Sequence, residues 1–119
     1  RVCFLGWRRD VPALLASADV FVCSSRHEPL GNIILEAWAS STPVISTNAD
    51  GPCHLIEPGK EGLLVPIEDP EALSNSINTL LENHALSERL AKDGFEKFNS
   101  EFTENVVVKK YISLLQQTI

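Results

Sequence analysis

Apolar and polar positions follow two different patterns along the chain. Four short apolar runs, at residues 2–5, 20–23, 43–46 and 62–65, have the length of buried strands. Other stretches repeat apolar residues every three or four positions, which is the spacing of amphipathic helices. Strands that alternate with helices predict an α/β fold, with a Rossmann-like parallel sheet, right-handed crossovers and flanking helices.

Capping residues predict where several helices begin. Asp10 is a possible N-cap for a helix over residues 11–18, with Pro12 tolerated in its first turn. Asp69 followed by Pro70 is a strong start signal after the fourth strand. The spacing in this helix and the next predicts these inward-facing residues: Leu73, Ile77, Leu80, Leu81, Leu86, Leu90, Phe95 and Phe98.

The C-terminal third is predicted to be entirely helical. We expect its middle helix to be broken or bent near Gly94, and its last helix to begin at Thr103 with Phe102 and Val107 as a hydrophobic staple. The last helix has a wide apolar stripe, which predicts packing on the core, with a groove for a partner as the alternative. The stripe comprises Val107, Val108, Tyr111, Ile112 and Leu115.

The centre of the chain is a strand, a loop and a helix. After the strand at 20–23 and the turn at 24–27, one buried helical face is predicted from Leu30, Ile33, Ile34, Ala37 and Trp38. Gly31 lies at the start of this helix, where the first amides point outward without partners. Because glycine has no side chain, a phosphate can approach its backbone closely, so this turn is a candidate anion site.

Two glutamates flank this turn. Glu28 comes just before the helix, and Glu36 is one turn beyond Asn32 on its polar face. Each carboxylate has two accepting oxygens and suits a pair of sugar hydroxyls. Taken alone, the same spacing also fits two solvated acids at a helix end.

Composition narrows the function classes. The chain has 119 residues, of which 44% are hydrophobic and 22% charged, as in one soluble globular domain. Its net charge of −6 argues against a nucleic-acid surface. The three cysteines lack CxxC spacing, so a disulfide framework and a zinc site are both improbable: Cys3, Cys23 and Cys53. With no apolar run near ~18 residues, no membrane span is predicted, and a cytoplasmic location is expected.

The motifs around Glu28 and Glu36 resemble a known family. With Pro29-Leu30-Gly31 between the glutamates, the chain is similar to the C-terminal, nucleotide-sugar-binding domain of the retaining GT-B glycosyltransferases of family 4. It departs from the family at Ser40-Ser41-Thr42, which lacks the usual glycine, and at Cys53-His54, where many relatives carry glutamate. Further matching blocks lie at 4–6, 18–22, 37–39, 43–46, 51–52, 62–66 and 69–73.

The resemblance implies roles for individual residues. The backbone of Leu30, Gly31 and Asn32 would hold the diphosphate or the transferred sugar in place of a metal ion, so neither a metal nor a cofactor is expected. Glu36 would bind the ribose hydroxyls. Glu28 would orient the donor sugar at the catalytic centre.

A base pocket is also implied by the resemblance. Trp7 is the candidate for lining it, with Arg8 beside it, although a solvated turn is the alternative for Arg8 and Arg9. No role is assigned to His27, Cys53 or His54.

The resemblance further implies that residues 1–119 are an incomplete donor-binding domain. Two sheet strands, the diphosphate clamp and the N-terminal acceptor domain would be missing, so the chain alone is expected to be inactive. The strand at 2–5 would lack neighbours, and the strand at 20–23 would expose an edge that permits self-association.

The implied full-length enzyme transfers sugar with retention from a UDP-, GDP- or ADP-sugar. Its acceptor would be a glycan, a lipid-linked molecule or a small molecule, in the cytoplasm or at the inner face of the membrane. The alternatives are another GT-B enzyme, such as an epimerase or phosphorylase, and a non-catalytic interaction module.

Overall fold

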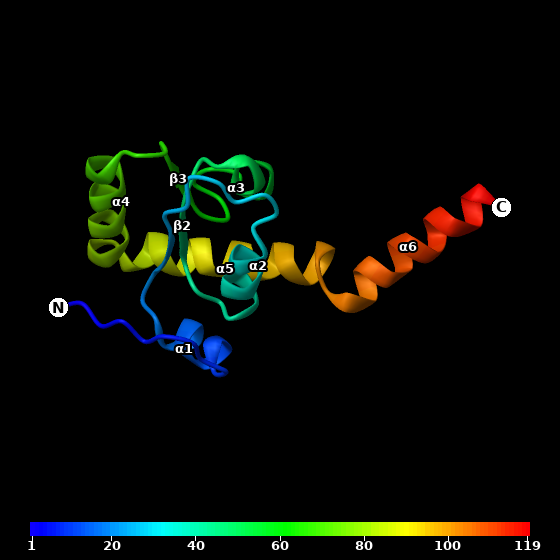
Figure 1. Cartoon of the computed structure of the whole chain (residues 1–119), viewed down its shortest axis with the longest axis horizontal. Helices are drawn as coiled ribbons and strands as arrows, with labels where there is room; N and C mark the ends of the chain where they lie inside the picture. The colour runs from blue at the N-terminus through cyan, green and yellow to red at the C-terminus, as the bar shows by residue number, and fades with distance from the viewer.

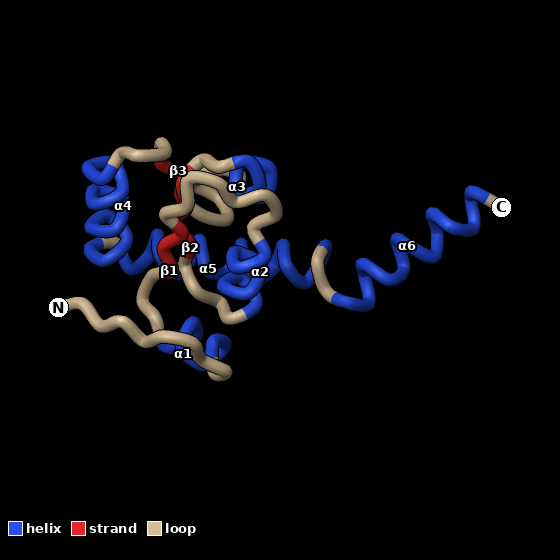
Figure 2. Tube along the Cα trace, in the orientation of Figure 1, coloured by secondary structure: helices blue, strands red, loops and turns tan.

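The computed structural model describes all 119 residues as a small parallel sheet with six helices. Figure 1 and Figure 2 show the sheet at the centre of the body and α6 projecting away from it. The elements are α1 (Val11–Ser17), β1 (Phe21–Cys23), α2 (Asn32–Ala39), β2 (Val44–Thr47), α3 (Asp50–Leu55), β3 (Leu63–Val65), α4 (Pro70–Glu82), α5 (His84–Glu101) and α6 (Glu104–Thr118). The predicted α/β class with a parallel sheet is confirmed.

The sheet has the strand order β1-β2-β3, and all its pairs are parallel. Phe21 pairs with Val44, and Ile45 pairs with Leu63. All four residues of β2 are buried, as expected for a central strand covered on both faces. The outer edge of β1 is unpaired, as predicted, and the carboxyl ends of the three strands lie at one edge of the sheet.

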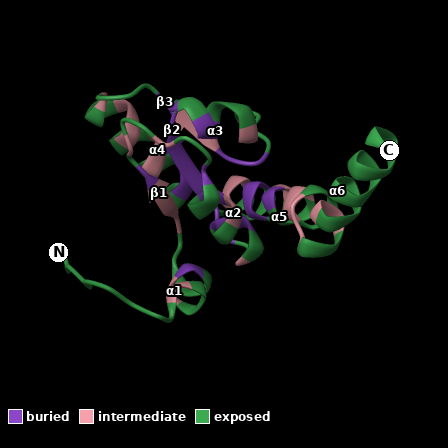
Figure 3. Ribbon diagram, turned by 45° about the vertical axis from the view of Figure 1, so that its right-hand side comes forward, coloured by how far each residue is buried: buried purple, intermediate pink, exposed green.

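The core lies on both faces of β2. Val44 belongs to a cluster with Leu15, Ile34 and Trp38, whereas its neighbour Ile45 belongs to a second cluster with residues of β3, α4 and α5. Successive strand residues point to opposite faces, so one strand serves both clusters. Figure 3 shows the buried residues gathered around this sheet.

Trp38 joins α2 to α5. Its ring is fully buried, and its indole Nε1 donates a hydrogen bond to the carbonyl oxygen of Glu61 over 2.9 Å. A Cβ atom added at Gly94 would lie 2.4 Å from the Cδ1 atom of Trp38. The predicted break near Gly94 is therefore wrong: α5 runs unbroken through it, and the glycine allows the ring to approach.

The strand predicted at residues 2–5 is absent. Residues 1–10 form no helix or strand, and Phe4 is 98% exposed. A strand requires a neighbour to accept and donate its backbone hydrogen bonds, and the observed sheet has no strand beside this segment. Apolar character alone did not make these residues a strand.

Helix α3 replaces part of a predicted loop. The sequence Asn48-Ala49-Asp50-Gly51-Pro52 predicts a polar, turn-rich loop, but α3 begins at Asp50 and includes Gly51 and Pro52. An acidic residue and a proline near a helix start are both favourable there, since the first amides have no intrahelical acceptors. The prediction of a loop throughout this segment is wrong.

The last helix is not part of the core. Thr103 precedes α6 as predicted, yet none of the residues of α6 is buried, and Tyr111 is 64% exposed. The prediction that its stripe packs on the core is therefore wrong. Leu81 and Phe95, also predicted to point inward, are exposed as well.

Two residues other than glycine have a left-handed backbone. They are Ser41, with φ of 54°, at the turn where the family's glycine is missing, and Glu68, with φ of 61°, after β3. None of the helices combines the length and apolar character that crossing a membrane requires.

Candidate functional site

The start of α2 has the geometry that the sequence predicts. Gly31 is the N-cap residue and has φ of 77°, a left-handed conformation that glycine adopts without steric cost. No side chain caps the helix. The first helical amides, those of Asn32 and Ile33, therefore remain directed at the edge where the strands end.

Helix α3 packs against the turn at residues 28–31 and hydrogen-bonds to it. The Gly51 amide donates to the Glu28 carbonyl oxygen over 2.7 Å. A Cβ atom at Gly51 would lie 2.6 Å from that oxygen, and one at Gly31 would lie 2.8 Å from the Cδ1 atom of Leu55. At Gly51 the loop backbone leaves no room for a side chain, whereas at Gly31 the left-handed φ is the stronger reason for glycine, because the Leu55 side chain can move.

The structure brings Glu28 and Gly31 together. The Glu28 carboxylate accepts a hydrogen bond from the Gly31 amide over 3.2 Å, and its residue is half-buried. Glu36 lies one turn further along α2 on its exposed face, with Asn32 exposed on the same helix. Glu28 in the loop before α2 and Glu36 on α2 itself therefore lie on either side of the free amides.

Two residues of the predicted buried face are exposed. Leu30 is 70% exposed and Ile33 is 38% exposed, whereas Ile34, Ala37 and Trp38 are buried. Leu30 precedes the helix, which begins at Asn32, so helical spacing does not apply to it. The expectation that Leu30 and Ile33 are buried is wrong, and both instead border the start of α2.

Trp7 and Arg8, the predicted base pocket, lie on the exposed segment before α1. The Arg8 guanidinium donates to both carboxylate oxygens of Asp10, over 2.7 and 2.6 Å. This hydrogen-bonded pair lowers the pKa of Asp10 and raises the pKa of Arg8. Asp10 stands at the N-cap position of α1 but caps no amide, because its carboxylate is committed to Arg8. The base pocket stays a prediction.

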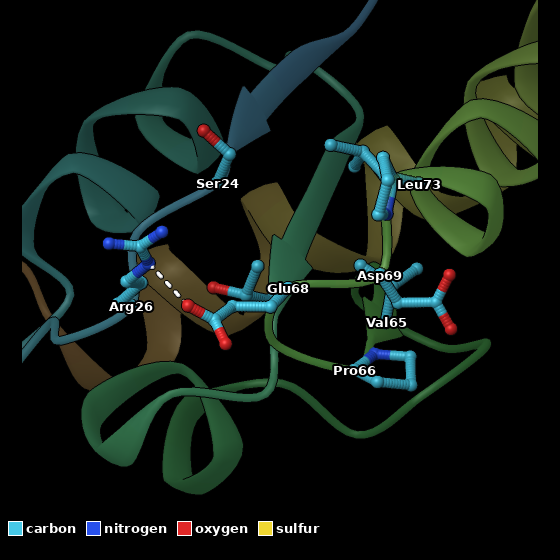
Figure 4. Close-up of a pocket in the computed structure, with 9 residues that line it drawn as sticks. Ser24, Arg26, Val65, Pro66, Glu68, Asp69 and Leu73 are labelled. Atoms are coloured by element: carbon cyan, nitrogen blue, oxygen red, sulfur yellow. Dashed lines mark ion pairs between the residues drawn. The ribbon is translucent and has the colours of Figure 1, made fainter.

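A pocket that the sequence reading missed lies where the three strands end. Its volume is about 370 Å³, and Ser24 follows β1, Thr47 ends β2 and Val65 ends β3. Figure 4 shows Arg26 and Glu68 joined at this pocket by an ion pair of 2.7 Å. Its residues come from segments far apart in the sequence. The available signal was the rule that open α/β sheets bind ligands at the carboxyl ends of their strands.

The histidine and cysteine side chains do not form a catalytic or metal-binding cluster. His27 and His54 are exposed, and no group of three His, Cys, Asp or Glu side chains is placed to hold a metal ion. All three cysteines are free; Cys23 is buried, and the Cys53 thiol donates to the Asp50 carbonyl oxygen over 3.0 Å. These residues add no catalytic cluster.

Comparison with known proteins gives a family match and similar chains. Residues 1–83 match the model of the family described as glycosyl transferases group 1. The lipopolysaccharide core biosynthesis glycosyltransferase LpsE of Rhizobium meliloti is 44% identical over 97% of this chain and 34% of its own length. LpsD of the same organism, with the same description, is 34% identical over 100% of this chain and 35% of its own length.

A solved structure agrees with the sequence comparison. Anabaena HepE in complex with UDP and glucose superposes with a TM-score of 0.90 at 31% identity, covering 100% of this chain and 32% of that one. This chain thus spans about a third of the length of these relatives. Since the family model covers well over half of its residues, the chain belongs to the group 1 family of glycosyl transferases.

Proposed function

We propose that this chain is the donor-binding part of a glycosyltransferase that takes its sugar from a nucleotide-diphosphate sugar. The observation that carries the proposal is the uncapped start of α2, where left-handed Gly31 opens a row of free amides beside Glu28. Such a helix start binds phosphate through its amides and the helix dipole. The HepE complex with UDP and glucose supports this type of ligand.

Each residue then has a role in positioning. Of the backbone predicted to hold the diphosphate, at Leu30, Gly31 and Asn32, the Gly31 amide donates to the Glu28 carboxylate. The amides of Asn32 and Ile33 therefore hold the diphosphate and offset the charge that develops on the leaving group, which requires no metal or cofactor. Glu36 accepts hydrogen bonds from the ribose hydroxyls, and Glu28 from hydroxyls of the donor sugar. Placing the anomeric carbon next to the acceptor supplies much of the rate enhancement.

The finer assignments rest on the motif at Glu28 and Glu36. Its resemblance to the retaining GT-B enzymes of family 4 supports transfer with retention of configuration. An N-terminal domain would supply most of the acceptor site, and this chain alone would be inactive. The names of LpsE and LpsD favour a growing lipopolysaccharide core as acceptor, at the cytoplasmic face of a membrane.

The test is calorimetric titration of the full-length protein with UDP-, GDP- and ADP-sugars. One nucleotide is expected to bind, and Glu36→Ala should weaken it by about 1–3 kcal/mol, because hydrogen bonds to a charged group are lost. Glu82→Ala, which removes an exposed acid at the end of α4, is the matched control. Absence of binding to all three classes would refute the donor-site proposal.

A Glu28 variant tests sugar transfer separately from nucleotide binding. In the full-length protein, Glu28→Ala should lower kcat for transfer more than it weakens nucleotide affinity, since the sugar is the only part of the donor that Glu28 contacts in this proposal. Unchanged transfer in this variant would instead favour a non-catalytic module on the same scaffold.

A further inference from the structure

The pocket at the carboxyl ends of the strands is lined by both apolar and polar residues. Val65, Pro66, Pro70 and Leu73 supply an apolar wall. Figure 4 shows Ser24 and Arg26 across the pocket from Val65 and Leu73, with Asp69 beside Val65. Its volume of about 370 Å³ is at the lower end of the range for small-ligand sites, ~300–1,000 Å³. The space therefore suits a single ring rather than a whole nucleotide.

The charges around the pocket disfavour an anion. The Arg26 guanidinium is paired with Glu68, and Asp69 adds a second carboxylate. Asp69 is committed to capping α4, since it accepts the Ala72 amide over 2.9 Å. With one cation against two carboxylates, this pocket suits a neutral ligand and contrasts with the free amides at α2.

The Arg26–Glu68 pair offers both donors and acceptors. The ion pair joins Nε of Arg26 to Oε1 of Glu68, which leaves the terminal guanidinium nitrogens and Oε2 available. Neighbouring hydroxyls of a sugar both donate and accept hydrogen bonds, so they match such a pair. The C–H face of the same ring would contact the apolar wall.

The backbone of Glu68 supplies an independent observation. Its φ of 61° costs a residue with a side chain about 1–2 kcal/mol relative to a right-handed conformation. Arg26 and Glu68 side chains are 74% and 65% exposed, and an exposed ion pair returns only ~0–1 kcal/mol. Folding stability alone thus favours glycine at this position, and strain of this kind is typical of functional sites.

We propose that this pocket binds one sugar ring of a saccharide acceptor, with Arg26 and Glu68 as the specificity-determining residues. Arg26 is two residues before Glu28, so one loop borders both this pocket and the proposed donor site. The acceptor assignment rests on the proposed transferase function. Binding of a neutral sugar ring does not, because it follows from the pocket itself.

The test is NMR titration of the ¹⁵N-labelled protein with methyl glycosides of glucose, galactose, mannose and N-acetylglucosamine, and separately with UDP. At least one glycoside is expected to shift amides near residues 24–26 and 66–69 with saturation in the millimolar range. Glu68→Gly and Arg26→Ala should each weaken that binding about tenfold, as expected for losing a hydrogen bond to a charged group.

The matched control is Ser41→Gly. Like Glu68→Gly, it relieves a left-handed backbone, but Ser41 does not line the pocket. Both variants should keep or raise the melting temperature, and only Glu68→Gly should lose glycoside binding. A fall in stability for Glu68→Gly would show that the side chain serves folding, which contradicts the proposal.

The two titrations keep the two proposals apart. The sugar-pocket proposal is refuted if none of the glycosides gives a saturable shift, whatever UDP does. It is also refuted if UDP binds in the pocket in place of the glycoside. If UDP shifts nothing in the full-length protein while a glycoside shifts pocket residues, the donor-site proposal fails and the sugar pocket stands. In full-length protein that transfers sugar, Glu68→Gly should raise the acceptor KM about tenfold and leave donor affinity unchanged.

Discussion

Helices α2 and α6 have similar apolar spacing but opposite environments. In α2, Ile34, Ala37 and Trp38 are buried to zero exposed area, whereas α6 has no buried residue at all. Helix α2 lies against the sheet and α5, while α6 follows α5 and projects from the body (Figure 1). The comparison teaches that spacing identifies an apolar face but not whether anything covers it.

The largest expected effect contrasts a tryptophan of α2 with a tyrosine of α6. Trp38→Ala should lower the free energy of unfolding by about 3–5 kcal/mol, because it empties a fully buried site. Tyr111→Ala, at an exposed position, should change it by no more than about 0.5 kcal/mol. Urea denaturation followed by circular dichroism measures both.

The Tyr111→Ala variant also tests whether α6 is exposed in solution. A loss above about 2 kcal/mol for Tyr111→Ala would exceed what exposed sites show and would mean that α6 is covered in solution. Repeating the measurement at several protein concentrations would then identify self-association, because only an intermolecular cover depends on concentration.

A smaller change in the free energy of unfolding is expected for a substitution at Gly94 of α5, which lies against Trp38. Gly94→Ala improves helix propensity but places a methyl group against the buried indole ring. Because Nε1 of Trp38 is tied to the Glu61 carbonyl, the ring has little freedom to move, and we expect a net loss of about 1–3 kcal/mol. Thermal unfolding measures this loss. Substitution of alanine for Ser113 on exposed α6 is the control, and a stabilised Gly94→Ala protein would contradict the close packing.

The smallest effect concerns Arg8 and Asp10, which lie outside the core. Asp10 has a pKa below its ordinary value of 3.8, because the Arg8 guanidinium hydrogen-bonds its charged form. The resulting stabilisation is present above that value and is lost as the pH falls through the folded pKa. NMR titration of the Asp10 carboxyl should show the lowered pKa, and Arg8→Ala should restore it. Both groups are exposed, so the melting temperature should barely respond. An ordinary pKa in the unchanged protein would argue against the pair.

Sequence reasoning worked best where local chemistry decides the structure. The Asp69 carboxylate caps α4 at the Ala72 amide, as the Asp-Pro start predicts. Gly31 opens α2 in the left-handed conformation expected of a glycine there. Residues 44–46 form the buried central strand within the predicted run. In each case the deciding contacts are within a few residues or follow from burial of a continuous apolar run.

The sequence predictions that the structure contradicts share a different cause. Residues 2–5 and the stripe of α6 are apolar enough for a strand and a core helix, but the structure offers neither of them a partner. Gly94 was read as a helix breaker because its contact with Trp38 lies 56 positions away in the sequence. The pocket was missed because Arg26 and Glu68 meet only when β1 and β3 are placed in one sheet.

The sequence by itself determined the fold class, three of the four predicted strands and the turn that offers free amides at α2. These follow from short-range hydrogen bonding and from the periodicity of apolar residues. Only the tertiary structure decided which apolar faces are buried, that Gly94 admits an indole ring, and that Arg26 meets Glu68 beside an apolar wall. Such contacts depend on where distant segments lie in space, which local propensity does not encode.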